Sequence, residues 1–256
     1  MTLNYLKILS AVALLSQTQN PRADEMFSSL DTTPAYREIK ETSFAKPYDI
    51  IDEYFAIESR QTTVSEAMSV KNSALGYAQD MYDFERVVRY AFSTPSLAYA
   101  QAVAEFIVIN ARPFINRYRD IDSILRLETK LFYVTQNRAL KEAGLHLAKT
   151  PGDLMLLASS AIANPSAAYL EMLADLIARN SDRVIFWDTP ISEILRMESK
   201  TRYINQAIAV KTAGLKTIRT RRELLDLSRP AFANPTPQYL QAIDQFRRQN
   251  EYRYPY

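Results

Sequence analysis

The chain has 256 residues, of which 47% are hydrophobic, and its 31 basic and 29 acidic side chains leave a net charge of +2. It contains no cysteine, four glycines and one histidine, His146. These counts exclude disulfides, thiolate metal sites and paired-histidine metal sites, and no pair of glycines forms a nucleotide-binding loop. We therefore expect no metal and no cofactor, and an ordinary loop histidine at position 146.

Residues 3–15 form the first predicted element, an apolar stretch in which Lys7 is the one charged side chain. A stretch of about thirteen residues is too short to cross the roughly 30 Å hydrocarbon core of a bilayer. It fits a helix docked on this chain or on a partner, a membrane-surface anchor, or a secretory signal within residues 1–23. We expect a soluble or assembly-bound protein, and the compartment stays open.

The rest of the chain repeats itself with a period of 70 residues and without insertions, which indicates a tandem duplication. A partial copy of one repeat helix precedes the first unit, at residues 33–36. The predicted organisation is an N-terminal extension, an incomplete first repeat, two full repeats, and a terminal helix with a tail, at residues 1–46, 47–93, 94–163, 164–233 and 234–256.

Each unit is predicted to contain three helices, whose boundaries follow from capping residues. The first helix opens at an Asn-Pro or Thr-Pro pair, with proline at the first helical position. These pairs begin at Thr94, Asn164 and Asn234. The third helix is short and is capped at its start by Asp80, Thr150 or Thr220.

The second helix is predicted to begin near Asp49, Asp120 or Thr189 and to continue past a repeated lysine, Lys71, Lys141 or Lys211. Gly144 and Gly214 follow at equivalent positions, where we expect a left-handed glycine cap. No segment alternates with the period of two that a strand requires. The predicted fold is therefore all-α: three tandem three-helix repeats stacked as a short helical array, with an N-terminal extension and a terminal capping helix.

A repeated glutamate is the most conspicuous candidate residue, because it lies on the apolar stripe of its helix. A buried carboxylate needs a hydrogen-bond or ionic partner. The basic residues two positions later point to the opposite side of the helix, so tyrosine hydroxyls and free amides at a neighbouring helix start are the favoured partners. This predicted structural tie comprises Glu58, Glu128 and Glu198 with Tyr99, Tyr169 and Tyr239.

Basic and aromatic side chains gather near the C-terminus. Residues 47–93 carry four basic and eight acidic side chains, a net charge of −4, whereas residues 164–256 carry fourteen and ten, a net charge of +4. The late basic cluster is a candidate contact for phosphates or for a protein partner, and the tyrosines form a candidate docking tail. The two sets are Lys216, Arg219, Arg221, Arg222, Arg247, Arg248 and Arg253, and Tyr252, Tyr254 and Tyr256.

The functional expectation is a non-enzymatic helical-repeat protein, a structural or adaptor subunit of a larger assembly such as a virion or another multi-subunit particle. Each repeat presents a single carboxylate, so no paired catalytic acids converge and no catalytic residues are expected. Stacked repeats provide extended surfaces for protein partners or for head-to-tail self-association. The alternative is an RNA-binding or RNP-associated subunit that uses the basic last repeat and the aromatic tail.

Overall fold

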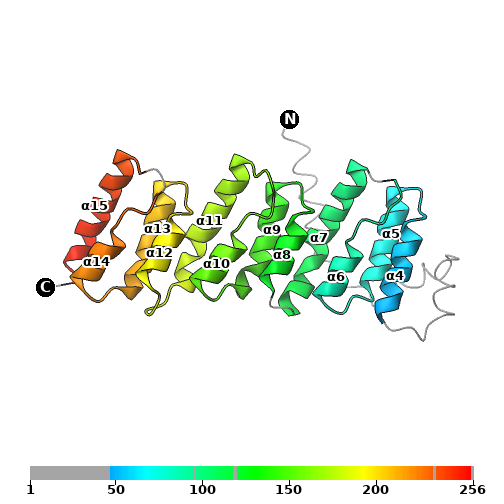
Figure 1. Cartoon of the computed structure of the whole chain (residues 1–256), viewed down its shortest axis with the longest axis horizontal. Helices are drawn as coiled ribbons and strands as arrows, with labels where there is room; N and C mark the ends of the chain where they lie inside the picture. Colours follow the sequence, from blue (N-terminus) through cyan, green and yellow to red (C-terminus); the bar gives the residue numbers. More distant parts are fainter. Residues whose placement is uncertain (1–46, 95, 118–119, 233–234, 255–256) are drawn as a thin grey trace, which may run out of the picture.

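The computed structural model describes residues 47–94, 96–117, 120–232 and 235–254, and within these ranges all regular structure is helical. The apolar stretch 3–15, the possible signal 1–23, the partial copy 33–36 and Tyr256 lie outside the described residues. The helices form an elongated row with α4 at one end and α15 at the other (Figure 1).

The row consists of three sets of four helices. Set 1 contains α4 (Pro47–Glu58), α5 (Val64–Leu75), α6 (Met81–Val87) and α7 (Leu97–Arg117). Set 2 contains α8 (Ile121–Glu128), α9 (Val134–Gly144), α10 (Pro151–Leu157) and α11 (Ala167–Val184). Set 3 contains α12 (Ile191–Glu198), α13 (Ile204–Gly214), α14 (Arg221–Leu227) and α15 (Pro237–Glu251). Short 3₁₀ turns, η1 (Leu145–Leu147) and η2 (Leu215–Thr217), follow α9 and α13.

The expectation of three helices in each unit was wrong, because the predicted second helix is two helices. α4, α8 and α12 stop at the repeated glutamate, and the next helix begins after a short connection. At the start of α5, Thr63 and Glu66 form a capping box in which each side chain bonds the backbone of the other residue. Gln136 and Gln206 accept hydrogen bonds from the backbone of Tyr133 and Tyr203 at the equivalent starts. The chain therefore turns instead of continuing one helix.

The predicted start of the first helix was two residues too early. The amide of Tyr169 donates to the hydroxyl of Ser166, which is the capping residue of α11, at 3.2 Å. Thr236 caps α15 in the same way. Asn164 and Pro165 therefore precede the cap, and the proline does not occupy the first helical position.

The prediction of left-handed glycine caps was also wrong. Gly144 ends α9 with a φ of −86°, and none of the described glycines has a positive φ. A Cβ at Gly144 would lie 2.2 Å from Cδ1 of Ile124, and one at Gly214 would lie 3.0 Å from Cγ2 of Ile194. The glycines are needed because the helix ends approach isoleucines on α8 and α12.

A main hydrophobic core runs along the array, with two smaller clusters around Tyr169 and Tyr239, and neighbouring sets share the main core. α7 packs on α9 and α11 packs on α13, while α6 contacts α8 and α10 contacts α12. Ala104 and Ile107 on α7 are buried, as are Ala174 and Ile177 at the equivalent places on α11.

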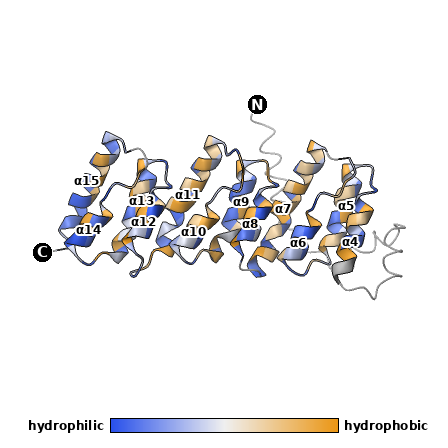
Figure 2. Ribbon diagram, viewed as in Figure 1, coloured by the Kyte–Doolittle hydropathy of each residue, from blue (hydrophilic) through white to orange (hydrophobic). Residues whose placement is uncertain are grey.

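The last helix of the row carries charges where α7 and α11 carry small or apolar side chains. Seventy residues after Ala174, Ile177, Ala178 and Ser181 of α11, α15 has Asp244, Arg247, Arg248 and Glu251. In Figure 2, α15 carries more hydrophilic colour than α7. A polar outer face is what the end of a stacked array needs in water. α15 is thus the fourth helix of set 3 and its polar cap, and it does not offer the apolar face on which another copy would stack.

Candidate functional site

The repeated glutamates and tyrosines meet in the interior. Each glutamate is the last residue of α4, α8 or α12, and each tyrosine lies in the first turn of α7, α11 or α15. In set 2 the Tyr169 hydroxyl donates to Oε1 of Glu128 at 2.8 Å. Equivalent hydrogen bonds join Tyr99 to Glu58 and Tyr239 to Glu198. The structure therefore joins the six residues of the tie in three glutamate–tyrosine pairs, one in each set.

Sequence reasoning missed the ionic partner, which is the repeated lysine thirteen positions later. The Nζ atoms of Lys71, Lys141 and Lys211 lie 2.8, 2.8 and 2.7 Å from Oε2 of the glutamate in the same set. The sequence showed that the lysines repeat, but we used them only to trace the predicted second helix. Each lysine lies close to its glutamate only because the chain turns between the two residues.

Each lysine is fully satisfied. Lys141 Nζ also donates to the carbonyl oxygens of Leu157 and Ser159, at 2.7 and 3.0 Å, and the other two lysines bond equivalent carbonyls. Three acceptors match the three N–H bonds of an ammonium group, and a helix carboxyl end favours a cation. We call each group of glutamate, lysine, tyrosine and two carbonyls a node; each node joins the four helices of its set.

Burial determines the protonation chemistry of the nodes. Desolvation lowers the pKa of Lys141, while Glu128 raises it. Desolvation and the nearby Glu128 carboxylate raise the pKa of the Tyr169 hydroxyl, which keeps this hydroxyl protonated as a donor. Glu128 and Lys141 are 0% exposed and Tyr169 is 1% exposed, so a substrate has no access to this node. The nodes connect the helices of each set and present no reactive group to solvent.

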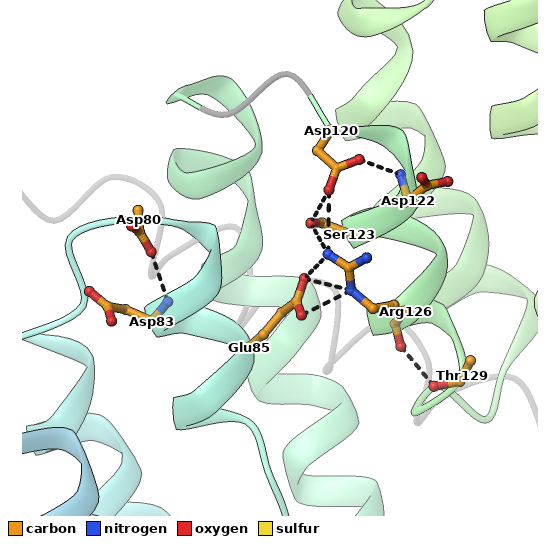
Figure 3. A network of polar contacts seen from close by, with 8 residues as sticks. All are labelled: Asp80, Asp83, Glu85, Asp120, Asp122, Ser123, Arg126 and Thr129. Atoms are coloured by element: carbon orange, nitrogen blue, oxygen red, sulfur yellow. Dashed lines mark hydrogen bonds and ion pairs between the residues drawn. The ribbon is translucent and has the colours of Figure 1, made fainter. Parts of the chain in front are cut away.

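The junction between sets 1 and 2 has an ion pair of its own. Arg126 on α8 bonds both carboxylate oxygens of Glu85 on α6, at 2.9 to 3.1 Å, and its Nη2 also contacts Asp120 at 3.3 Å (Figure 3). Asp120 caps α8 by accepting a hydrogen bond from the amide of Asp122. Such a bidentate contact fixes the angle between neighbouring sets more strictly than a single ion pair would.

Most of the predicted basic cluster is paired with carboxylates of the same chain. Lys216 lies 2.6 Å from Asp182, and Arg221 pairs with Glu251. On the outer side of α15, Arg247 and Arg248 both contact Asp244, at 2.5 and 2.8 Å. Arg222 is exposed, Arg253 lies over the Tyr252 ring, and Arg219 lies over the ring of Trp187. The structure does not bring the seven cations together as one free surface.

The predicted tyrosine tail divides into different environments. Tyr252 is 75% exposed, whereas Tyr254 packs against the core and its hydroxyl lies 3.4 Å from the carbonyl oxygen of Leu215. Tyr256 lies outside the described residues. Tyr254 thus anchors the end of the chain to η2.

Sequence reasoning missed an exposed aromatic cluster on the loop between α11 and α12. Phe186 is 52% exposed and Trp187 is 66% exposed, and the Arg219 guanidinium lies 5.3 Å from the Trp187 ring centroid. Two hydrogen bonds close the loop: the Phe186 amide donates to the Thr189 hydroxyl at 2.9 Å, and the Thr189 amide donates to the Phe186 carbonyl oxygen at 3.1 Å. We call Phe186, Trp187 and Arg219 the aromatic cluster. Its signal in the sequence was an adjacent aromatic pair that contains the only tryptophan.

His146 lies in η1, and not in an irregular loop, with its Nδ1 atom 3.0 Å from the carbonyl oxygen of Ala143. Within the described ranges, no three His, Cys, Asp or Glu side chains are grouped as metal ligands. No helix in the same ranges has the length and apolar character needed to cross a membrane.

No known protein family, no curated protein and no solved structure matches the chain.

Proposed function

We propose that the chain is a non-enzymatic structural or adaptor subunit of a larger assembly, for example a virion or another multi-subunit particle, and that it works through protein contacts. The buried nodes support this proposal, because the most distinctive polar residues of the repeats maintain the fold. The polar face of α15 argues against an open head-to-tail filament, so the proposed partner is a different protein.

The observation that carries the proposal is the aromatic cluster. Binding hot spots are enriched in tryptophan and arginine, and a rigid loop loses little conformational entropy when it binds. Phe186 and Trp187 are adjacent in sequence and both exposed, and the Arg219 guanidinium lies over the Trp187 ring and interacts electrostatically with the Glu223 carboxylate. A surface with an apolar recess and a neighbouring carboxylate would match all three side chains.

The repeat supports a role in binding because set 1 does without these aromatic residues. The positions that correspond to Phe186 and Trp187 hold Asn116 and Arg117, seventy residues earlier. The four-helix arrangement therefore does not require an aromatic pair there, and large exposed apolar side chains would otherwise be an aggregation liability.

The test is immunopurification of the untagged protein from its native source, with the wild type compared with the double variant Phe186→Asn, Trp187→Arg. This variant imports the side chains that set 1 carries at these two positions, where they end α7, and the fold should tolerate it because Phe186 and Trp187 are exposed. We expect a co-purified protein with the wild type and at least a tenfold lower yield of that protein with the variant.

Phe132→Arg is the matched control. Phe132 is 45% exposed, and set 3 has Arg202 at the equivalent position. This variant should retain the partner. Equal loss with both variants would reject the aromatic cluster as the contact, and purification of the wild type as a lone monomer would reject the subunit role itself.

RNA binding is the second candidate and rests on Arg219, which lies over an aromatic ring as cations in nucleic-acid sites do. It receives less support, because Lys216, Arg221, Arg247 and Arg248 are already paired with carboxylates. Salt-sensitive retention on single-stranded RNA, abolished by changing Arg219, Arg221 and Arg222 to Glu, would place this candidate first.

A further inference from the structure

The outer side of α13 forms the floor of an open groove between α11 and α15. Two adjoining hollows, of about 750 and 650 Å³, share Ile208 and Thr212 as lining residues. The first lies on the α11 side, where Ala178 and Ile204 contribute, and the second extends to Phe246 on α15. Ile204 and Ile208 are only partly buried. Apolar side chains thus line part of the groove, beside polar ones such as Asn205 and Gln249.

The same place in set 2 is occupied by charges. Arg138 on α9 lies 3.3 Å from Asp175 on α11, and Arg179 lies 2.9 Å from the same carboxylate. Seventy residues later these positions hold Ile208, Gln245 and Gln249, and Glu142 is replaced by Thr212. Set 3 therefore lacks these ion pairs, although Asp182 and Arg253 are among the residues that line its groove, so the lining seen here is not a requirement of the repeat.

We infer that the groove binds residues 3–15 of the same chain. This stretch has one charge, Lys7, and its Leu, Ile, Val and Ala side chains match the apolar lining of the groove. An apolar segment of this size is costly to leave in water, and an apolar groove is a recurrent place to bury one. Ala209, exposed on α13, leaves space for close approach.

The connection is long enough. Residues 16–46 number 31, which is 46 minus 15, and such a chain extends up to about 100 Å at roughly 3.3 Å per residue. α5, α7, α9, α11 and α13 are successive neighbours in one layer, so the path from α5 to α13 is roughly 40 Å at about 10 Å per step. The segment can thus reach the groove from the start of α4.

Cysteine cross-linking tests the inference, because the full chain has no cysteine of its own. The double variant Ala11→Cys, Ala209→Cys places one thiol in the segment and one in the groove. The matched control is Ala11→Cys, Ala139→Cys, since Ala139 is the exposed equivalent of Ala209 on α9. Under mild oxidation we expect an intramolecular disulfide at least tenfold faster with the first pair. Equal rates, or no disulfide with the first pair, would overturn the inference.

Hydrogen exchange on the full chain provides a second measurement. Changing both Leu9 and Val12 to Asp should speed exchange of the α13 amides at least fivefold and leave the α9 amides unchanged. Unchanged α13 exchange would reject the groove as the binding site. A cross-link formed only between copies in a mixture of single-cysteine chains would reject the intramolecular form. Native protein that begins after Ala23 would also reject it, because the segment would be a removed signal.

Discussion

The Nζ atom of Lys141 lies 2.8 Å from Oε2 of Glu128, and neither side chain is exposed to solvent. A buried ion pair of this kind adds little stability compared with an apolar pair, yet removing one partner strands a charge in a medium that cannot solvate it. Such a pair recurs every 70 residues, so the stability of each set depends on keeping both its glutamate and its lysine.

Replacing Glu128 with Gln should lower the free energy of unfolding by about 3–5 kcal/mol, because Lys141 loses its counter-charge while buried. Denaturant unfolding followed by circular dichroism would measure the loss. Glu142→Gln, which changes an exposed carboxylate on α9, should be neutral within about 0.5 kcal/mol. If Glu128→Gln proved as mild as this control, the tyrosine hydrogen bond alone would hold the carboxylate.

Replacing Tyr169 with Phe should cost less, about 1–3 kcal/mol, because one hydrogen bond to the carboxylate is lost while the ring keeps its packing. The same unfolding measurement applies. The two variants should also be non-additive, since the residues share one network. A double variant that lost the sum of the two effects would argue against that shared network.

Replacing Gly144 with Ala should destabilise the protein by about 1–3 kcal/mol, through overpacking against Ile124. Helix propensity alone would instead favour alanine by about 1 kcal/mol, so the sign of the effect is decisive. Gly76→Ala is the control, because a Cβ there would lie 3.5 Å from the nearest neighbour, which is ordinary contact. Thermal melting of both variants would decide; a stabilised Gly144→Ala protein would contradict the close approach.

The node tyrosines should make the folded protein less stable at alkaline pH. Desolvation and the Glu128 carboxylate raise the pKa of Tyr169 above its unfolded value of about 10. A group with a raised folded pKa contributes stability that is fully present below the unfolded pKa and is lost as pH rises through the folded pKa. We expect wild-type stability to fall above about pH 10, less steeply in Tyr169→Phe. Parallel pH profiles of the two proteins would refute this assignment.

The charged face of α15 should keep the array from stacking further. Importing the α11 residues by Asp244→Ala, Arg247→Ile, Arg248→Ala and Glu251→Ser should produce concentration-dependent association in light scattering, because an apolar face becomes exposed. The double variant Glu142→Ala, Arg222→Ala, which removes two exposed charges elsewhere on the protein, is a control for general loss of charge. A quadruple variant that associated no more than this control would show that α15 is not a cap.

Much of the architecture could be predicted because duplication repeats its signals. The cap residues Asp80, Thr150 and Thr220 located the short helices, and the glutamates on apolar stripes pointed to a buried tie. The helix break before Val134 and Ile204 was not predicted, since tyrosine is an unusual residue at a helix start. The lysine partners depend on that break, and the aromatic cluster depends on loop exposure, which no periodicity encodes.

Each node closes within its own set: the glutamate, the lysine, the carbonyls and the tyrosine of set 2 all lie between Ile121 and Val184. Deleting or adding a complete stretch of 70 residues in the interior would leave each node with all its partners. Deleting a shorter piece that contains only the glutamate or only the lysine of a node would leave the other charge buried without its partner. The chain can therefore change its length in whole units much more safely than in fractions of a unit, and its polar end would stay in place through such changes.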